Sequence, residues 1–169
     1  MEISNCVIED VNTIFNLYDA ARKLQTARNM VVWPFFEKKF LENEIVNGQQ
    51  WKIIIDGEIA CNWTIALTDK EIWEGKEKGD AIYIHRIVTN PNFRGNNLVT
   101  KIVEWAKVYA DKINRKYVRL DTLGNNTRLI EHYTKSGFTF LGMFKLTDTK
   151  SLPAHYQKEP NCCLFEIMI

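Results

Sequence analysis

The stretch from Val88 to Leu98, Val-Thr-Asn-Pro-Asn-Phe-Arg-Gly-Asn-Asn-Leu, joins an apolar strand to an amphipathic helix through a proline loop and an Arg-Gly turn. The first backbone N–H groups of a helix have no partner within the helix, and the helix dipole adds partial positive charge there. Such a turn binds phosphate groups. We therefore expect a site for phosphate or pyrophosphate at this turn, while an ordinary helix cap is the alternative that this stretch alone leaves open.

The residues on either side of the turn predict a strand–helix–strand unit. The nearly continuous apolar run from Ala81 to Val88 is typical of a central strand that is covered on both faces. A further strand is expected from Tyr117 to Thr122, parallel to the first. The helix between them would face the sheet with apolar side chains that recur at helical spacing, namely Leu98, Ile102, Trp105, Ala106, Tyr109 and Ile113.

Toward the N-terminus the pattern predicts two helices and a hairpin. The first helix spans residues 10 to 24, with Asp10 as its cap, and the second spans residues 34 to 47. The strands Trp51–Ile55 and Ile59–Leu67 are joined by an Asp-Gly dipeptide, which tolerates positive φ and is typical of a hairpin turn.

Toward the C-terminus we expect a helix from Thr127 to Ser136 and apolar strands at Phe138–Leu146 and Cys163–Ile169. Together these elements predict an α/β (α+β) fold. Its central sheet would be mixed and mostly antiparallel, with six to seven strands, one parallel pair and about four flanking helices.

Composition limits the classes of partner. A length of 169 residues predicts a single domain over residues 1–169. Because 22 Lys and Arg nearly balance 21 Asp and Glu, we expect neither a nucleic acid nor a membrane as partner. The absence of a basic, apolar leader and of a long apolar run predicts a cytoplasmic protein. The four cysteines form no Cys-x-x-Cys pair, which favours reduced thiols and no metal site.

Three blocks of sequence, in order, resemble those of a known family. The first is Ile82-Tyr-Ile-His-Arg-Ile-Val-Thr-Asn-Pro-Asn-Phe-Arg-Gly95, and the second is Arg119-Leu-Asp-Thr122. The third places Asn126 seven residues before Tyr133, followed by Gly137-Phe138. These blocks are similar to the strand and pyrophosphate loop, the next strand, and the Asn…Tyr…Gly-Phe block of the GNAT superfamily of acetyl-CoA-dependent N-acetyltransferases. The resemblance implies a GNAT-like sheet whose parallel pair is splayed.

The resemblance also implies acetyl-CoA as cofactor and a set of residues that hold it. The main chain around Ile87 and Val88 would pair with the pantetheine arm as an added strand, which requires a local break such as a bulge. Continuous strand pairing is the alternative. The implied cofactor-binding residues are Arg86, Ile87, Val88, Arg94, Gly95, Asn96, Asn97, Leu98, Val99, Asn126 and Tyr133.

The pyrophosphate loop departs from the family pattern at two positions. Asn97 and Val99 stand where small residues are usual, since a side chain there would hinder the approach of the backbone to phosphate. Asparagine is the most common substitute for glycine in unusual backbone conformations. The β-branched Val99 would have to point its methyl groups away, so weaker CoA binding is one outcome that these residues predict.

Aminolysis of a thioester needs a base, because a lysine-like amine with a pKa of about 10.4 is protonated at neutral pH. Asp121 and His85 are the two candidates, directly or through water; Asp121 as a brace of the following turn and His85 as a core histidine are the alternatives. By resemblance, Tyr133 is the general acid for the leaving thiolate, unless it is only a core tyrosine. Asn126 would bind the cofactor, cap a helix, or do both.

The segments Ala27–Phe36 and Thr68–Asp80 would, by resemblance, shape the acceptor pocket. The candidate walls of this pocket are Trp33, Phe35, Trp73 and Tyr83, although packing of helices on the sheet would use the same aromatic residues. The near-neutral charge favours a small-molecule amine as acceptor, and the protein is expected as a monomer or a homodimer.

Three hypotheses of different classes follow. The first is an N-acetyltransferase that acts on a primary amine by direct attack. The second is an acyl-CoA-binding sensor or pseudoenzyme, suggested by Asn97 and Val99. The third is an interaction module that pairs through an exposed edge of the C-terminal strand.

Overall fold

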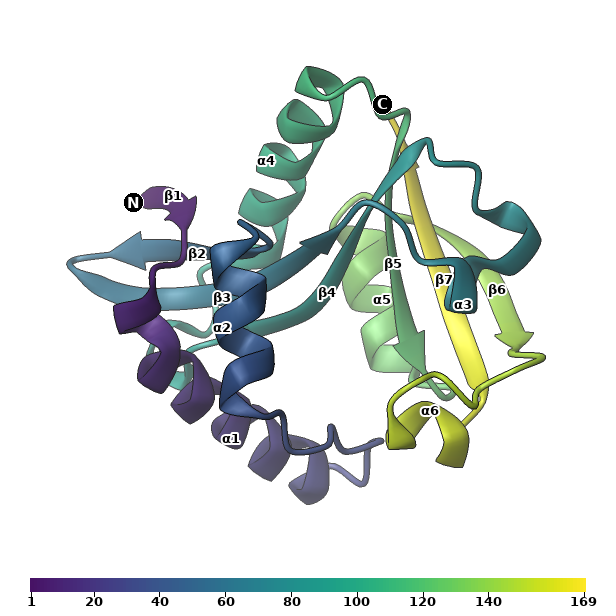
Figure 1. Ribbon diagram of the computed structural model, residues 1–169, viewed down its shortest axis with the longest axis horizontal. Helices are drawn as coiled ribbons and strands as arrows, with labels where there is room; N and C mark the ends of the chain where they lie inside the picture. The colour runs from purple at the N-terminus through teal and green to yellow at the C-terminus, as the bar shows by residue number, and fades with distance from the viewer. The chain divides into compact units, whose positions relative to one another are not determined.

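The computed structural model describes residues 1–169, which form a mixed sheet of seven strands in the order β1-β2-β3-β4-β5-β7-β6 (Figure 1). The strands are β1 (Glu2–Asn5), β2 (Gln50–Ile55), β3 (Glu58–Ala66), β4 (Ala81–Thr89), β5 (Tyr117–Leu123), β6 (Thr139–Lys145) and β7 (Asn161–Met168). The helices are α1 (Val11–Ala27), α2 (Lys38–Val46), α3 (Lys70–Trp73), α4 (Leu98–Lys112), α5 (Thr127–Lys135) and α6 (Ala154–Lys158). The predicted fold class and strand number are confirmed.

The chain divides into two compact units. Unit 1 comprises Met1–Ile65 and His85–Leu98, and unit 2 comprises Ala66–Ile84 and Val99–Ile169. The division falls within β4, so each unit contains part of this strand. The single domain expected over residues 1–169 stays a prediction.

Unit 1 contains the predicted hairpin. β2 and β3 pair in antiparallel fashion, and Asp56 and Gly57 between them have φ values of 51° and 82°. This turn confirms the prediction made from the Asp-Gly dipeptide, because both residues adopt the positive φ of a hairpin turn. β1 pairs with β2 and was not predicted, since four residues give too short a pattern. One buried cluster of this unit's core lies among α1, α2 and the strands and consists of Cys6, Val11, Ile14, Leu17, Tyr18, Leu41, Ile45 and Val88.

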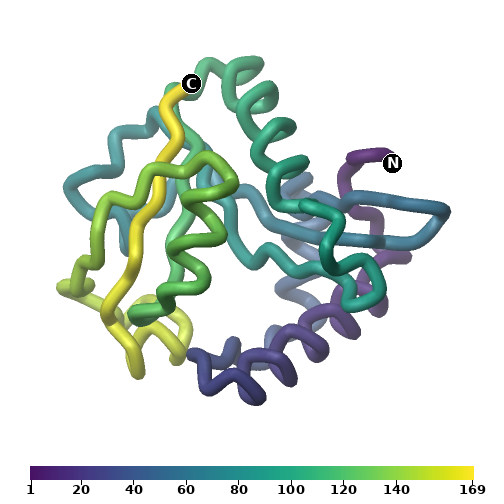
Figure 2. The backbone as a smooth tube through the Cα atoms, turned by 180° about the vertical axis from the view of Figure 1, so that it is seen from behind, coloured from purple at the N-terminus to yellow at the C-terminus, as the bar shows by residue number.

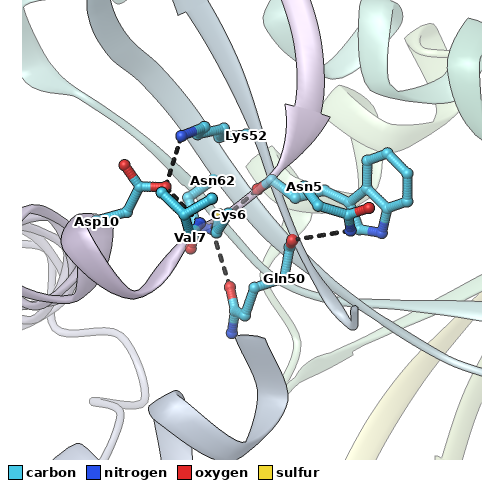
Figure 3. A network of polar contacts seen from close by, with 8 residues as sticks. Asn5, Cys6, Val7, Asp10, Gln50, Lys52 and Asn62 are labelled. Carbon is cyan, nitrogen blue, oxygen red and sulfur yellow. Dashed lines mark hydrogen bonds and ion pairs between the residues drawn. The ribbon is translucent and has the colours of Figure 1, made fainter. Parts of the chain in front are cut away.

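Asp10 lies at the predicted N-cap of α1 but does not cap the helix through its side chain. Its Oδ2 accepts hydrogen bonds from the Val7 N–H at 2.8 Å and from Lys52 Nζ at 2.5 Å. Figure 3 shows the Asp10 and Lys52 side chains directed toward each other. The predicted cap is therefore wrong in its contacts, because the carboxylate pairs with a lysine of β2 instead of with the helix N–H groups.

The second predicted helix begins later than expected. Residues up to Glu37, which has φ −73° and ψ 146°, are outside the helix, and α2 starts at Lys38. In the segment before it, Phe35 and Phe36 instead contact Arg22 and Tyr18 of α1.

In unit 2, β4 and β5 pair in parallel from Ala81↔Tyr117 to Tyr83↔Arg119, which confirms the predicted parallel pair. β7 is antiparallel to β5 on one side and to β6 on the other. The C-terminal strand is therefore not an edge strand, and the exposed edge that the interaction-module hypothesis required is wrong. Figures 1 and 2 both show α5 beside β7, where Tyr133 of the helix contacts Phe165 of the strand.

One buried cluster of the unit 2 core includes residues of α3, β4 and β7. Its buried members are Ile72, Trp73, Ala81, Tyr83, Leu146, Cys162 and Leu164. The short helices α3 and α6 were not predicted, because four or five residues cannot display a helical period.

The four cysteines are buried and free of disulfides. Burial raises the pKa of Cys6 to about 12 and that of Cys61 to about 12, and it also raises the pKa values of Cys162 and Cys163. All four are therefore thiols and not thiolates at neutral pH. None of the helices combines the length and the apolar character that crossing a membrane requires.

Candidate active site

β4 contains a residue with an unusual backbone. Arg86 has φ of 50°, in the left-handed region that residues other than glycine, asparagine and aspartate rarely adopt. A regular strand cannot continue through such a residue. The backbone therefore changes direction immediately before Ile87 and Val88, where the resemblance implies pairing with pantetheine.

The Arg86 side chain binds to neighbouring elements of unit 1. Its Nη2 donates to Glu44 Oε1 of α2 and to Thr64 Oγ1 of β3, the latter at 3.0 Å. Gln50 Nε2 of β2 donates to the second Glu44 oxygen at 2.8 Å and to Thr64 Oγ1 at 2.8 Å. The guanidinium also lies over the ring of Phe36, 5.2 Å from its centroid. We refer to Arg86, Glu44, Gln50, Thr64 and the rings of Phe36 and Phe40 as the Arg86 cluster.

The predicted pyrophosphate loop follows β4. Gly95 has φ of 87° and Asn97 has φ of 51°, so Asn97 adopts the conformation for which glycine is usual. The residues from Arg94 to Asn97 are exposed. The Asn96 side chain turns back and donates to the Phe93 carbonyl oxygen at 2.9 Å. The sign of φ therefore alternates along this exposed loop, and such a backbone can direct N–H groups toward an anion.

Val99 is only 8% exposed, and Leu98 before it is 4% exposed. A methyl group that projected into an open anion site would be exposed to solvent, so the Val99 side chain does not occupy such a space. Both departures from the family motif are thus compatible with a phosphate at this loop. The weaker CoA binding expected from Asn97 and Val99 stays a prediction.

Asp121 lies on β5 in unit 2, half-buried. The Tyr156 hydroxyl of α6 donates to its Oδ2 at 3.0 Å. Burial raises the pKa of Asp121 to about 6, although the Tyr156 hydrogen bond acts in the opposite direction. Asp69, also in unit 2, has its pKa raised to about 8, first by burial and then by the negative charge of Asp121 and of nearby glutamates. Asp121 is therefore ionised at neutral pH and titrates close to it.

His85, the other candidate base, is half-buried at the start of the unit 1 part of β4. Burial first, and then the positive charge of Arg86, lower the pKa of His85 to about 3. Its imidazole is neutral at pH 7 and a much weaker base than the Asp121 carboxylate.

α5 carries two of the candidate residues. Asn126 is the N-cap, and its Oδ1 accepts from the Leu129 N–H at 3.1 Å, so the capping role that the sequence left open is confirmed. Tyr133 lies seven residues after Asn126 and is half-buried. Its ring packs against Phe138 and Phe165, with centroid distances of 6.0 and 5.4 Å. The packing fixes the ring in place, and the general-acid role of the hydroxyl group stays a prediction.

Three of the four aromatic candidates for the acceptor pocket are packed in cores. Trp73 is 1% exposed and Tyr83 is 0% exposed, and both contact the buried guanidinium of Arg119. Trp33 packs edge-on against Tyr18 in unit 1, at 5.8 Å between ring centroids. The structure therefore gives all three a packing role, which was the alternative in the sequence.

Unit 1 contains a pocket of 470 Å³ at the C-terminal half of α1 and the segment that follows it. Phe35, which is 81% exposed, lies under the guanidinium of Arg22 at 3.2 Å from the ring centroid. The pocket is lined by Asp19, Arg22, Lys23, Thr26, Ala27, Val32 and Phe35. It overlaps the segment Ala27–Phe36 that was expected to shape the acceptor site.

Sequence reasoning missed Tyr156 and Glu44. Tyr156 belongs to a helix of five residues with no periodic signal, and its partner Asp121 is 35 positions away. Glu44 has the sequence pattern of a surface charge on an amphipathic helix, and its partner Arg86 is 42 positions away.

The chain is similar to known proteins both in sequence and in structure. The uncharacterized N-acetyltransferase YesJ of Bacillus subtilis is 26% identical over 74 residues, which are 44% of this chain and 41% of YesJ. The chain spans less than half the length of the curated relatives that it matches. A GNAT-family acetyltransferase structure from Listeria monocytogenes superposes with a TM-score of 0.75 at 20% identity, covering 99% of this chain and 94% of the other.

The structure of yncA from Salmonella typhimurium, described as a putative acetyltransferase with its cofactor acetyl-CoA, superposes with a TM-score of 0.70 at 13% identity, covering 99% and 92% of the two chains. These superpositions show the fold. The model of the acetyltransferase (GNAT) family matches residues 20–138, more than half of the sequence. The chain therefore belongs to the GNAT acetyltransferase family, whose enzymes use acetyl-CoA.

Proposed function

We propose that this protein transfers the acetyl group of acetyl-CoA to the primary amine of a small molecule, by direct attack of the amine on the thioester. The observation that carries the proposal is the loop after β4, where Gly95 and Asn97 both have positive φ and the Val99 side chain is buried. This backbone supports binding of a pyrophosphate by main-chain N–H groups, with the exposed Arg94 adding a positive charge.

In the proposed reaction, the amine nitrogen bonds to the carbonyl carbon, the carbon–sulfur bond breaks, and CoA leaves as its thiol. One proton must leave the amine, and one must reach the sulfur. We assign these proton transfers to two side chains of unit 2, with Asp121 as the general base and Tyr133 as the general acid.

The pKa values support Asp121 over His85 as the base. A general base is most effective when its pKa lies near the working pH. Asp121, with a pKa of about 6, is nearly fully ionised at pH 7 and is still basic enough to accept a proton. His85, with a pKa of about 3, is neutral but far less basic.

The proposed cofactor contacts are divided between main chain and side chain. The residues Arg86, Ile87 and Val88 supply main-chain groups for pantetheine, and the left-handed Arg86 supports this by breaking the strand before them. Residues 94 to 99 bind the pyrophosphate. Asn126 already caps α5 with one oxygen, so its amide N–H₂ group is the part available to a ligand.

The acceptor is proposed to be a small molecule because of the pocket beside Phe35. Its volume of 470 Å³ is within the range of roughly 300 to 1,000 Å³ that is usual for small-molecule sites. The exposed Phe35 and Val32 offer apolar contacts, and the Asp19 carboxylate accepts from Arg22 at 3.0 Å at the same pocket. The net charge of +1 gives no general attraction for long basic or acidic chains.

The test is release of free thiol from acetyl-CoA in the presence of a panel of small amines. We expect thiol release with at least one amine and its loss in Asp121→Asn and Tyr133→Phe. Binding of CoA in a calorimetric titration without thiol release for any amine would contradict the transferase proposal and favour an acyl-CoA sensor. No binding of CoA would contradict both.

A further inference from the structure

We propose that Glu44 is a positioning residue for acetyl-CoA. Its carboxylate holds the Arg86 guanidinium and thereby keeps the backbone of Arg86 in its left-handed conformation. This conformation makes the main chain of Ile87 and Val88 available to the pantetheine arm. The inference rests on the proposed function, in which these two residues pair with the pantetheine arm. Glu44 is on α2 and is not among the residues assigned to the cofactor.

The first argument is the burial of the ion pair. The Arg86 and Glu44 side chains are only 18% and 12% exposed, and the guanidinium is close to two phenylalanine rings. Burial alone lowers the pKa of Arg86, but Tyr18 and Glu44 raise it above the usual value, so the group stays charged. A buried charge of this kind depends on its partner, and Glu44 is the acidic partner.

The second argument is the backbone of Arg86. An arginine with φ of 50° is unfavourable by itself and persists only where contacts around the residue hold it. The Arg86 cluster supplies such contacts, since Nη2 is bonded to both Glu44 and Thr64. Without Glu44, the side chain loses the contact that ties it to α2, and the strained conformation loses support.

The third argument is that Glu44 itself is fixed. Its second oxygen accepts from Gln50 Nε2, and Gln50 is 0% exposed and also bonded to Thr64 and Tyr18. The carboxylate therefore has one defined position, between a strand residue and the Arg86 side chain. A fixed anion of this kind can set the position of a backbone segment to which it is not itself bonded.

A second buried ion pair in unit 1 provides a matched control. Asp10 and Lys52 are 14% and 10% exposed and join the start of α1 to β2 (Figure 3). Neither residue has a positive φ, and Lys52 pairs with Ser4 of β1 and Asn62 of β3. Asp10→Asn should destabilise unit 1 without altering the backbone of β4.

The experiment compares Glu44→Gln with Asp10→Asn in steady-state kinetics, calorimetric titration with CoA and thermal unfolding. For Glu44→Gln we expect the KM for acetyl-CoA and the Kd for CoA to rise about tenfold, because small displacements of binding groups have large effects. The KM for the amine and kcat should change little. For Asp10→Asn we expect a comparable loss of thermal stability with unchanged KM and Kd.

Glu44→Asp is the second variant, in case Glu44→Gln does not fold. It keeps the charge but shortens the reach, so the Kd for CoA should rise by less than in Glu44→Gln, about threefold. Glu42, on the same helix, pairs with Lys38 at 3.8 Å at the surface. Glu42→Gln should therefore behave as wild type.

The inference is overturned if the Glu44 variants lose stability and active fraction while their Kd for CoA matches that of Asp10→Asn. That result would leave the proposed function intact. Conversely, a wild-type protein that binds CoA but releases no thiol would contradict the transferase and still permit the comparison of Kd values. A wild-type protein that does not bind CoA would overturn both.

Discussion

Each unit contains a buried arginine that binds a glutamate and lies over aromatic rings, but the two arginines have different backbones. In unit 2, Arg119 donates to Glu166 at 2.7 Å across regular antiparallel pairing of β5 and β7, and its guanidinium lies 4.7 Å from the centroid of the Trp73 ring. In unit 1, Arg86 contacts Glu44 from a left-handed position in β4. The same side-chain chemistry stabilises a regular sheet in one case and a strained residue in the other.

The comparison extends to the proposed chemistry. In the proposed function, the pantetheine contacts of unit 1 are main-chain groups, whereas unit 2 supplies Asp121 and Tyr133 as titratable side chains. We therefore expect substitutions at Asp121 and Tyr133 to reduce the rate, and substitutions at Glu44 and Arg94 to reduce the affinity for CoA.

The largest effect is expected for Tyr133→Phe. Loss of a general acid typically lowers the rate by about 10² to 10⁴, and the phenylalanine keeps the ring contacts with Phe138 and Phe165. Steady-state thiol release should show a fall in kcat with an unchanged Kd for CoA. Tyr117→Phe, in the same unit, is the control, and a Tyr133→Phe enzyme as fast as wild type would remove the acid assignment.

Glu166→Gln tests the structural role of the second arginine. It leaves the Arg119 guanidinium, 6% exposed, without its closest carboxylate, which should lower the free energy of unfolding by about 2 kcal/mol. Urea unfolding measures this loss. The KM for acetyl-CoA of the folded protein should stay at the wild-type value. A KM raised as in Glu44→Gln would show that the two arginine clusters do not differ in the way we describe.

The pH dependence tests the base. Because burial raises the pKa of Asp121 to about 6, the active, ionised form is lost as the pH falls below that value. At pH 5 the kcat/KM should be about tenfold lower than on the plateau above pH 7. The Tyr156 hydroxyl of unit 2 donates to Asp121 and lowers its pKa, while the Asp121 carboxylate in turn raises the pKa values of Asp69 and Cys162. Asp121→Asn should lack this limb of the profile, and a profile that keeps it would assign the titration to another group.

The smallest effect is expected for Arg94→Ala. Arg94 is exposed at the end of the 3₁₀ turn Pro91–Phe93, so its contact with phosphate is screened by water. The Kd for CoA should rise about fivefold, as for a solvent-exposed charge pair. Calorimetry at low and high salt measures the change, with Arg128→Ala on α5 as the control. An unchanged Kd would exclude Arg94 from the phosphate site.

Local sequence signals predicted those parts of the fold that depend on local geometry. The Asp-Gly turn, the apolar run of β4 and the periodic face of α4 depend on backbone preference and on spacing within one element. The place of β7 between β5 and β6 was not predictable in this way, because strand order is decided by pairing between distant segments.

The same distinction holds for the candidate site. The loop after β4 and the cap at Asn126 could be identified because glycine and asparagine favour the backbone conformations that these positions adopt. The contacts of Asp10 with Lys52, of Glu44 with Arg86 and of Tyr156 with Asp121 join residues 35 to 42 positions apart. Nothing in one short window of sequence indicates which distant charge a side chain meets.

The burial of all four cysteines has a practical consequence for measuring turnover. Disulfide-exchange dyes react with thiolates, and here every cysteine sulfur is both shielded and protonated at neutral pH. The folded enzyme should therefore contribute almost no background colour, so that the dye reports product CoA alone. In a separate run without an acceptor, a slow rise of that background on warming would report exposure of the buried cysteines as the cores open. The same dye assay would then measure catalysis in one run and unfolding in the other.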